Sequence, residues 1–130
     1  MATRLITFAP AVSVPSLVII AARCWRKTRD TRRSPQPALY AALTEHRCGT
    51  LAPAFDGLLR IYEACTGRLI RIGGTSLGYV SADEQRLIKL LEMPKSRLSA
   101  DETRRFPRLV PTMRIALQTT KLMLRQALPV

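Results

Sequence analysis

Apolar residues recur every three or four positions along most of this chain, and prolines or glycines interrupt the pattern at intervals. This spacing places the apolar side chains on one side of an α-helix. A chain of 130 residues is long enough to bury a core between such helices. The pattern predicts an all-α, single-domain bundle of about five or six short helices over residues 13–130. It also predicts an extended N-terminal lead over residues 1–12 and a glycine-containing loop or minor strand around residues 68–80.

Proline and glycine positions predict where individual helices begin and end. The first helix begins near residues 13–15, and the second runs from Pro35 to Gly49. Proline suits the first turn of a helix, and glycine suits the left-handed residue that closes it. By the same signals the third helix stops at Gly67, and the last one starts near Pro111.

The tetrapeptide SADE occurs twice, at residues 81–84 and 99–102. A serine followed three residues later by glutamate is the capping box of a helix start, in which each side chain bonds the other residue's backbone N–H. Ser81 and Glu84 precede a regular apolar stripe, whereas Pro107 limits the helix that would follow Ser99 and Glu102. We interpret the repeat as two helix starts and not as a duplicated active site.

The charge of the chain is strongly positive. It has 21 Lys and Arg against nine Asp and Glu, a formal net charge of +12. Residues 1–47 and 94–130 each have a charge of +6, and the segment between them is neutral. Such an excess favours anionic partners: an acidic protein, nucleic acid or an anionic membrane surface. A solvated cationic surface without a partner is the alternative.

Two groups of basic residues are candidates for binding an anionic partner. The denser one follows the first apolar segment, and the second recurs along one side of the last predicted helix. Arginine also suits bidentate contact with carboxylate or phosphate. The first group is therefore expected to bind more strongly. The candidates are Arg23, Arg26, Lys27, Arg29, Arg32 and Arg33 in the first group, and Arg114, Lys121 and Arg125 in the second.

Residues 5–22 contain no charged side chain, which raises the possibility of a membrane span. The basic residues that follow would then hold the rest of the chain on the cytoplasmic side of an inner membrane. Pro10 and Pro15 interrupt the run, however, and the helix that begins near residues 13–15 continues past it, with apolar residues on one side and basic residues on the other in its second half. We therefore expect a helix of a cytoplasmic protein and no membrane anchor.

Catalytic and metal-binding patterns are missing from the sequence. Cys24, Cys48 and Cys65 are far apart and form no CxxC pair, and His46 is the single histidine. A zinc site needs four ligands at short paired spacings. The glycines after residue 72 match neither the GxxxxGK[ST] spacing nor the GxGxxG spacing of phosphate-binding loops. No enzyme activity, metal or cofactor is predicted.

Several stretches together resemble a known group of proteins. These are "LVIIAARCW", "F-x-x-L-L-R", "R-L-I-R-I" and "S-A-D-E-x-R-L-I-K-L-L", in this order over about residues 15–95. In this respect the chain resembles small uncharacterised helical proteins of alphaproteobacteria. The resemblance implies a helical fold and a bacterial cytoplasm, and it implies no activity. Members have a cysteine-rich loop before the last of these stretches, whereas the "GGTSLGY" of this chain has no cysteine.

These features predict a small, basic, non-catalytic interaction or regulatory protein that binds an acidic protein or forms a homo-oligomer. The alternative is a nucleic-acid-binding regulator that uses the arginine-rich segment 23–33, where Trp25 would stack on a base. A third reading, anchoring in the membrane through residues 5–22, is the least favoured of the three.

Overall fold

The computed structural model describes residues 13–73, 79–93, 104 and 107–128. Within these ranges the chain forms five α-helices and two short 3-10 helices, with no strand, so the all-α prediction is confirmed. The predicted lead over residues 1–12 and the second capping box, Ser99 and Glu102, lie outside the described residues. The elements are α2 (Val14–Asp30), α3 (Pro35–Thr44), η1 (Gly49–Leu51), α4 (Ala52–Thr66), α5 (Ala82–Glu92), η2 (Pro107–Leu109) and α7 (Val110–Ala127).

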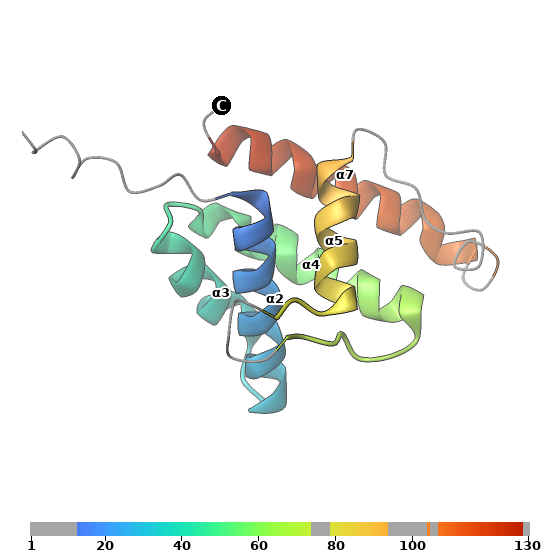
Figure 1. Cartoon of the computed structure of the whole chain (residues 1–130), viewed down its shortest axis with the longest axis horizontal. Helices are drawn as coiled ribbons and strands as arrows, with labels where there is room; N and C mark the ends of the chain where they lie inside the picture. The colour runs from blue at the N-terminus through green and yellow to red at the C-terminus, as the bar shows by residue number, and fades with distance from the viewer. Residues whose placement is uncertain (1–12, 74–78, 94–103, 105–106, 129–130) are drawn as a thin grey trace, which may run out of the picture.

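The helices pack in two crossed directions (Figure 1). Helices α2 and α5 lie side by side and are in contact, although about fifty residues separate them in the chain. Helix α4 crosses behind them and packs against α7, while α3 covers the other side of α2 and also contacts α4. The extended segment after α4 therefore runs between α4, α2 and α5, where it meets polar side chains from all three helices.

One continuous apolar core joins all five α-helices. Its largest fully buried side chains include Trp25 on α2, Tyr62 and Phe55 on α4, and Met113 on α7. The apolar spacing of α4 places one side of the helix in this core, where the buried residues include Phe55, Leu58, Leu59, Tyr62 and Cys65. A fully buried Leu or Phe side chain contributes about 1.5–3 kcal/mol, so this shared core is the main source of stability.

Local signals set the helix starts as predicted. Ser13 caps α2 by accepting a hydrogen bond from the Ser16 N–H (3.3 Å), and Pro15 lies in the first turn. Ser81 and Glu84 form the complete capping box of α5. Gly67 closes α4 in the left-handed conformation, with φ 71°.

The end of α3 corrects one prediction. The helix stops at Thr44 and not at Gly49, and the left-handed residue that closes it is Arg47, with φ 60°. The Arg47 N–H donates to Thr44 O, and the Cys48 N–H donates to Leu43 O. Both bonds belong to the Schellman motif. This turn places the Cys48 side chain in the core. The burial of Cys48 therefore favours a helix end at Thr44.

The chain after α4 is an ordered loop over residues 67–73, and the alternative of a minor strand is wrong for these residues. Ile70 is fully buried and anchors the loop, whereas Leu69 is exposed. Within the described parts of the chain, no helix is both long and apolar enough to cross a membrane. The apolar stretch considered as a span enters α2 at Val14, and its residues 5–12 lie outside the description.

Candidate anion-binding site

Two adjacent buried carboxylates at the start of α5 hold the 67–73 loop. Asp83 accepts hydrogen bonds from Arg68 Nη1 and Nη2 (2.6 and 2.7 Å), from the Arg71 N–H (2.7 Å) and from Tyr62 Oη (2.8 Å). Burial by itself raises the pKa of the Asp83 carboxyl, but these hydrogen bonds and the charge of Arg68 outweigh burial and lower it. Burial and the bond to Asp83 raise the pKa of Tyr62.

Glu84 serves the same loop from its other end. Its carboxylate accepts from Arg23 Nε (2.9 Å), the Gly73 N–H (3.0 Å) and the Ser81 N–H (2.9 Å). The side chain is fully buried, which by itself raises its pKa, yet the bonds from Arg23 and the two backbone groups lower it. The Ser81 hydroxyl adds a bond to Arg71 O (2.6 Å). The capping box therefore also fixes a loop distant in the sequence.

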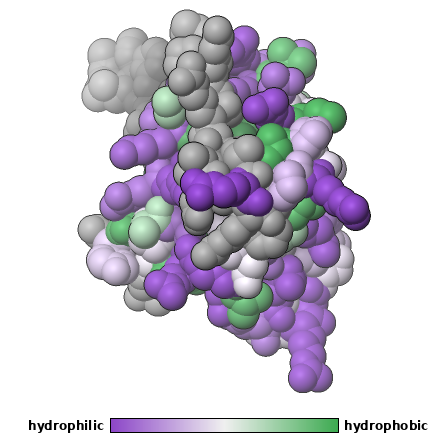
Figure 2. Space-filling model, turned by 90° about the vertical axis from the view of Figure 1, so that its right-hand side faces the viewer, coloured by the Kyte–Doolittle hydropathy of each residue, from purple (hydrophilic) through white to green (hydrophobic). Residues whose placement is uncertain are grey.

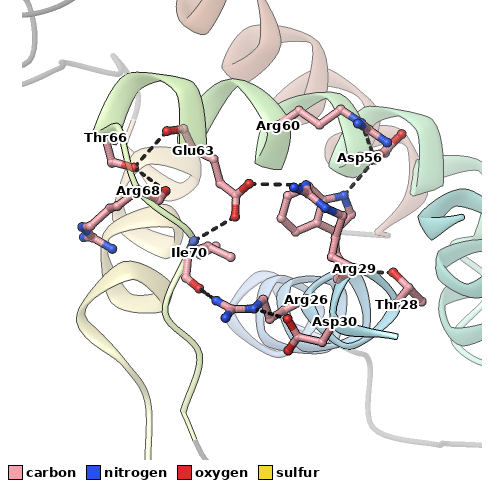
Figure 3. A network of polar contacts seen from close by, with 11 residues as sticks. Arg26, Thr28, Arg29, Asp30, Asp56, Arg60, Glu63, Thr66, Arg68 and Ile70 are labelled. Carbon is pink, nitrogen blue, oxygen red and sulfur yellow. Dashed lines mark hydrogen bonds and ion pairs between the residues drawn. The ribbon is translucent and has the colours of Figure 1, made fainter. Parts of the chain in front are cut away.

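Glu63 on α4 bridges the loop to α2 (Figure 3). One carboxylate oxygen is 3.3 Å from Arg29 Nη1, and the other accepts from the Ile70 N–H at 2.9 Å. Arg26 in turn donates to Ile70 O and to Asp30 (3.0 Å). The guanidinium of Arg29 lies 4.7 Å from the centre of the Trp25 ring, a distance at which cation–π attraction acts.

Asp56, which is buried on α4, accepts hydrogen bonds from three further side chains of this region. It accepts from Trp25 Nε1 (2.8 Å), Gln36 Nε2 (3.0 Å) and Arg60 Nε (3.0 Å). Trp25 is completely buried. It therefore cannot stack on a base, and that part of the nucleic-acid hypothesis is wrong.

Five arginines from three segments lie around these contacts: Arg26 and Arg29 from α2, Arg60 from α4, and Arg68 and Arg71 from the loop. Four of them are seen together in Figure 3. They line two open hollows. The α4 hollow, of about 570 Å³, has Arg29, Arg60 and Arg68 on its walls, and the α5 hollow, of about 480 Å³, has Arg26 and Arg71.

Among the described residues, a single acidic side chain lines each hollow. Glu63 lines the α4 hollow and Asp30 lines the α5 hollow, and both are already paired with an arginine. The positive charge on the walls therefore exceeds the negative charge in both places. We call the five arginines and the two hollows the arginine surface.

The first predicted basic group divides into two kinds of residue. Arg23, Arg26 and Arg29 bond to carboxylates or backbone carbonyls within the fold. The side chains of Lys27, Arg32 and Arg33 are exposed and form no hydrogen bond or ion pair with a described residue. The expectation that all six are displayed for a partner is therefore too simple.

The second predicted group lies on α7, away from the loop. Arg114 and Arg125 are exposed. Lys121 is half-buried and donates to Met93 O at the end of α5 (2.5 Å), and burial together with the charge of Arg125 lowers its pKa.

Sequence reasoning missed Arg60, Arg68 and Arg71. The only available signal was the spacing of four between Asp56 and Arg60, which suits an ion pair along a helix.

Among the described residues, no three His, Cys, Asp or Glu side chains come close enough together to hold a metal ion. His46 lies half-buried in the turn after α3 and not on a helix face.

No family model matches the sequence, and neither a curated protein nor a solved structure matches it significantly.

Proposed function

We propose that this protein is a non-catalytic interaction protein that binds an acidic partner protein through the arginine surface. The observation that carries the proposal is the convergence of five arginines from α2, α4 and the loop on two hollows whose acidic residues are already paired. Electrostatic complementarity of this kind accelerates association and selects partners. The +12 charge extends the attraction beyond the contact itself.

The carboxylates support a binding role over an enzymatic one. Asp56, Glu63, Asp83 and Glu84 each accept hydrogen bonds from arginine and from further donors. A general base needs a carboxylate that is able to take up a proton from a substrate. The bonds that lower the pKa of Asp83 and Glu84 make them poor bases.

The character of the surface supports a charge-driven contact. Among the coloured residues on the face shown in Figure 2, hydrophilic ones predominate and hydrophobic ones are scattered between them. The exposed apolar side chains include Leu69 beside Arg68 and Tyr79 beside the α5 hollow. Tyrosine and arginine are common anchors in protein interfaces. A reducing bacterial cytoplasm as the location is supported by the resemblance to alphaproteobacterial proteins and by the three cysteines, Cys24, Cys48 and Cys65, which form no disulfide among the described residues.

Fluorescence anisotropy tests the proposal with three labelled probes: a glutamate-rich peptide, a neutral peptide of equal length, and a DNA duplex. We expect saturable binding of the acidic peptide that weakens as salt rises from about 50 to about 200 mM, with no binding of the neutral peptide. Tighter, strongly salt-dependent binding of DNA would instead support the nucleic-acid regulator. If no anionic probe binds at low salt, the proposal is wrong and the positive charge is only a solvated surface.

A further inference from the structure

The α4 hollow carries the larger share of the arginine surface, because three of the five arginines line it and two line the α5 hollow. Arg29 comes from α2, Arg60 and Glu63 from α4, and Arg68 and Leu69 from the loop that follows Gly67. The side chains of the three arginines are 37%, 53% and 42% exposed, in chain order. They are thus partly shielded from water while their ends remain accessible.

The arginines retain unused donors. A guanidinium has five N–H groups. Arg60 uses Nε for Asp56, and its two terminal amino groups donate to no described residue. Arg29 contributes only Nη1, at 3.3 Å, to Glu63. Both oxygens of Glu63 are occupied, one by Arg29 and the other by the Ile70 N–H. An incoming carboxylate would therefore find free donors with little competition from within the hollow.

The donors are also held in place before a ligand arrives. Arg68 is fixed by its two bonds to Asp83, and Arg60 by its bond to Asp56, which Trp25 and Gln36 also hold. A group that is ordered in advance loses less conformational entropy on binding. The C-terminal end of α4, which is the negative end of the helix dipole, also lies at this hollow. One carbonyl of this last turn, that of Glu63, already accepts hydrogen bonds from the Gly67 N–H and from Thr66 Oγ1.

The rim of the hollow favours a peptide over a nucleic acid. Leu69 is 54% exposed beside Arg68 and offers an aliphatic surface to a neighbouring side chain. No aromatic side chain of the described residues lines the α4 hollow, and base stacking is what most single-strand binders use. We propose that the α4 hollow binds an acidic peptide segment, with its carboxylates on Arg60 and Arg29 and an adjacent apolar side chain on Leu69. This inference rests on the proposed function and assigns its site.

Substitutions at Arg60 and Leu69 test the assignment with a labelled peptide in which glutamates flank one leucine. Loss of a charged hydrogen-bonding group costs about tenfold in affinity, so we expect Arg60→Gln to weaken binding about tenfold. Arg60→Lys keeps the charge but loses the planar guanidinium, so its affinity for the peptide should lie between that of the unsubstituted protein and that of Arg60→Gln. Arg114→Gln is the matched control, because it removes one exposed positive charge from α7 and should change affinity less than about twofold.

Leu69→Ala should weaken binding of this peptide and leave binding of a leucine-free glutamate peptide unchanged. Thermal unfolding by circular dichroism checks that each variant is folded, which we expect since Asp56 keeps its bonds from Trp25 and Gln36 when Arg60 is replaced. Equal losses for Arg60→Gln and Arg114→Gln would overturn the site while leaving the proposed function standing. If the unsubstituted protein bound no acidic peptide, both proposals would fail.

Discussion

Individual residues in the 67–73 loop have little freedom to change, because several of its backbone N–H groups donate to specific buried carboxylates. The N–H groups of Ile70, Arg71 and Gly73 donate to Glu63, Asp83 and Glu84 respectively. The loop thus depends on three carboxylates that come from two helices. Buried polar groups left without such partners are costly, so single substitutions here should have large and specific effects.

Gly73 offers the sharpest test of this packing. A Cβ atom at this position would lie 2.1 Å from Tyr79 O and 2.4 Å from Arg23 Nη2. Gly73→Ala should therefore destabilise the protein by about 1–3 kcal/mol through overpacking. The measurement is urea unfolding followed by circular dichroism.

Gly57 is the matched control for this prediction. It lies on the exposed side of α4, and a Cβ atom there would meet nothing within 4 Å. Gly57→Ala should stabilise the protein by up to about 1 kcal/mol, since glycine is a poor helix former. Equal effects of the two substitutions would show that the contacts around Gly73 are not as described.

The lowered pKa values of Asp83 and Glu84 predict a loss of stability in acid. Both groups bind protons more weakly in the folded chain than in the unfolded chain. Their contribution is therefore complete above the ordinary carboxyl pKa of about 4 and is lost as the pH falls through and below that value. We expect the free energy of unfolding to fall steeply between about pH 5 and about pH 3.

Urea unfolding across this pH range checks the expectation. Glu84→Gln should make the decline shallower, because one of the two linked carboxylates is gone. Glu92→Gln, at an exposed position at the end of α5, should leave the slope of the unsubstituted protein unchanged. A decline that is equally steep in Glu84→Gln would contradict the assignment to this carboxylate.

At the scale of elements, two helices end in the same unusual way. Both α2 and α3 close with a Schellman motif in which arginine occupies the left-handed position: Arg32 with φ 58° and Arg47 with φ 60°. Left-handed backbone costs a non-glycine residue about 1–2 kcal/mol. The remaining contacts of each turn must offset this cost, and for α3 they include the burial of Cys48.

Replacing either arginine by glycine should therefore stabilise the protein. Arg47→Gly and Arg32→Gly are each expected to raise the free energy of unfolding by up to about 1 kcal/mol. Their exposed side chains form no ion pair with a described residue that would be lost. Arg114→Gly, within α7, should have the opposite sign, since glycine is unfavourable inside a helix. Thermal and urea unfolding of the three variants measure these signs.

The molecule as a whole has more positive charge than its internal ion pairs use. Its net charge is +12, and the carboxylates of Asp56, Glu63, Asp83 and Glu84 are already taken by arginines. Repulsion among the remaining cations opposes the compact state. The same charge would attract an acidic partner, so the proposed function and the stability of the free protein depend on one property.

Salt should accordingly stabilise the free protein. Raising sodium chloride from about 0.01 to about 0.2 M shortens the screening length to below about 10 Å, which weakens repulsion at the surface more than it weakens the buried pairs. We expect the thermal midpoint to rise. The double variant Arg114→Gln/Arg125→Gln should show a smaller rise, and a midpoint that falls with salt would indicate that exposed ion pairs dominate over repulsion.

The helices themselves were determined by the sequence, because their signals are local. As helix caps, Ser13, Ser81 and Gly67 act through hydrogen bonds to residues three or four positions away, and the apolar spacing decides which side of each helix is buried. Such contacts form in any chain with these residues at these spacings. The five helices and most of their buried positions were therefore predictable.

Only the tertiary structure decided what the charged residues do. Arg23 and Glu84 are 61 positions apart, and Arg68 and Asp83 are 15 apart, so their pairing depends on how α2, α4 and α5 pack. The same packing buried Trp25 and Cys48, placed Arg47 and not Gly49 at the end of α3, and brought Arg60 beside Arg29 and Arg68. A long-range ion pair requires two helices to meet at one register, and no spacing along the chain specifies that register.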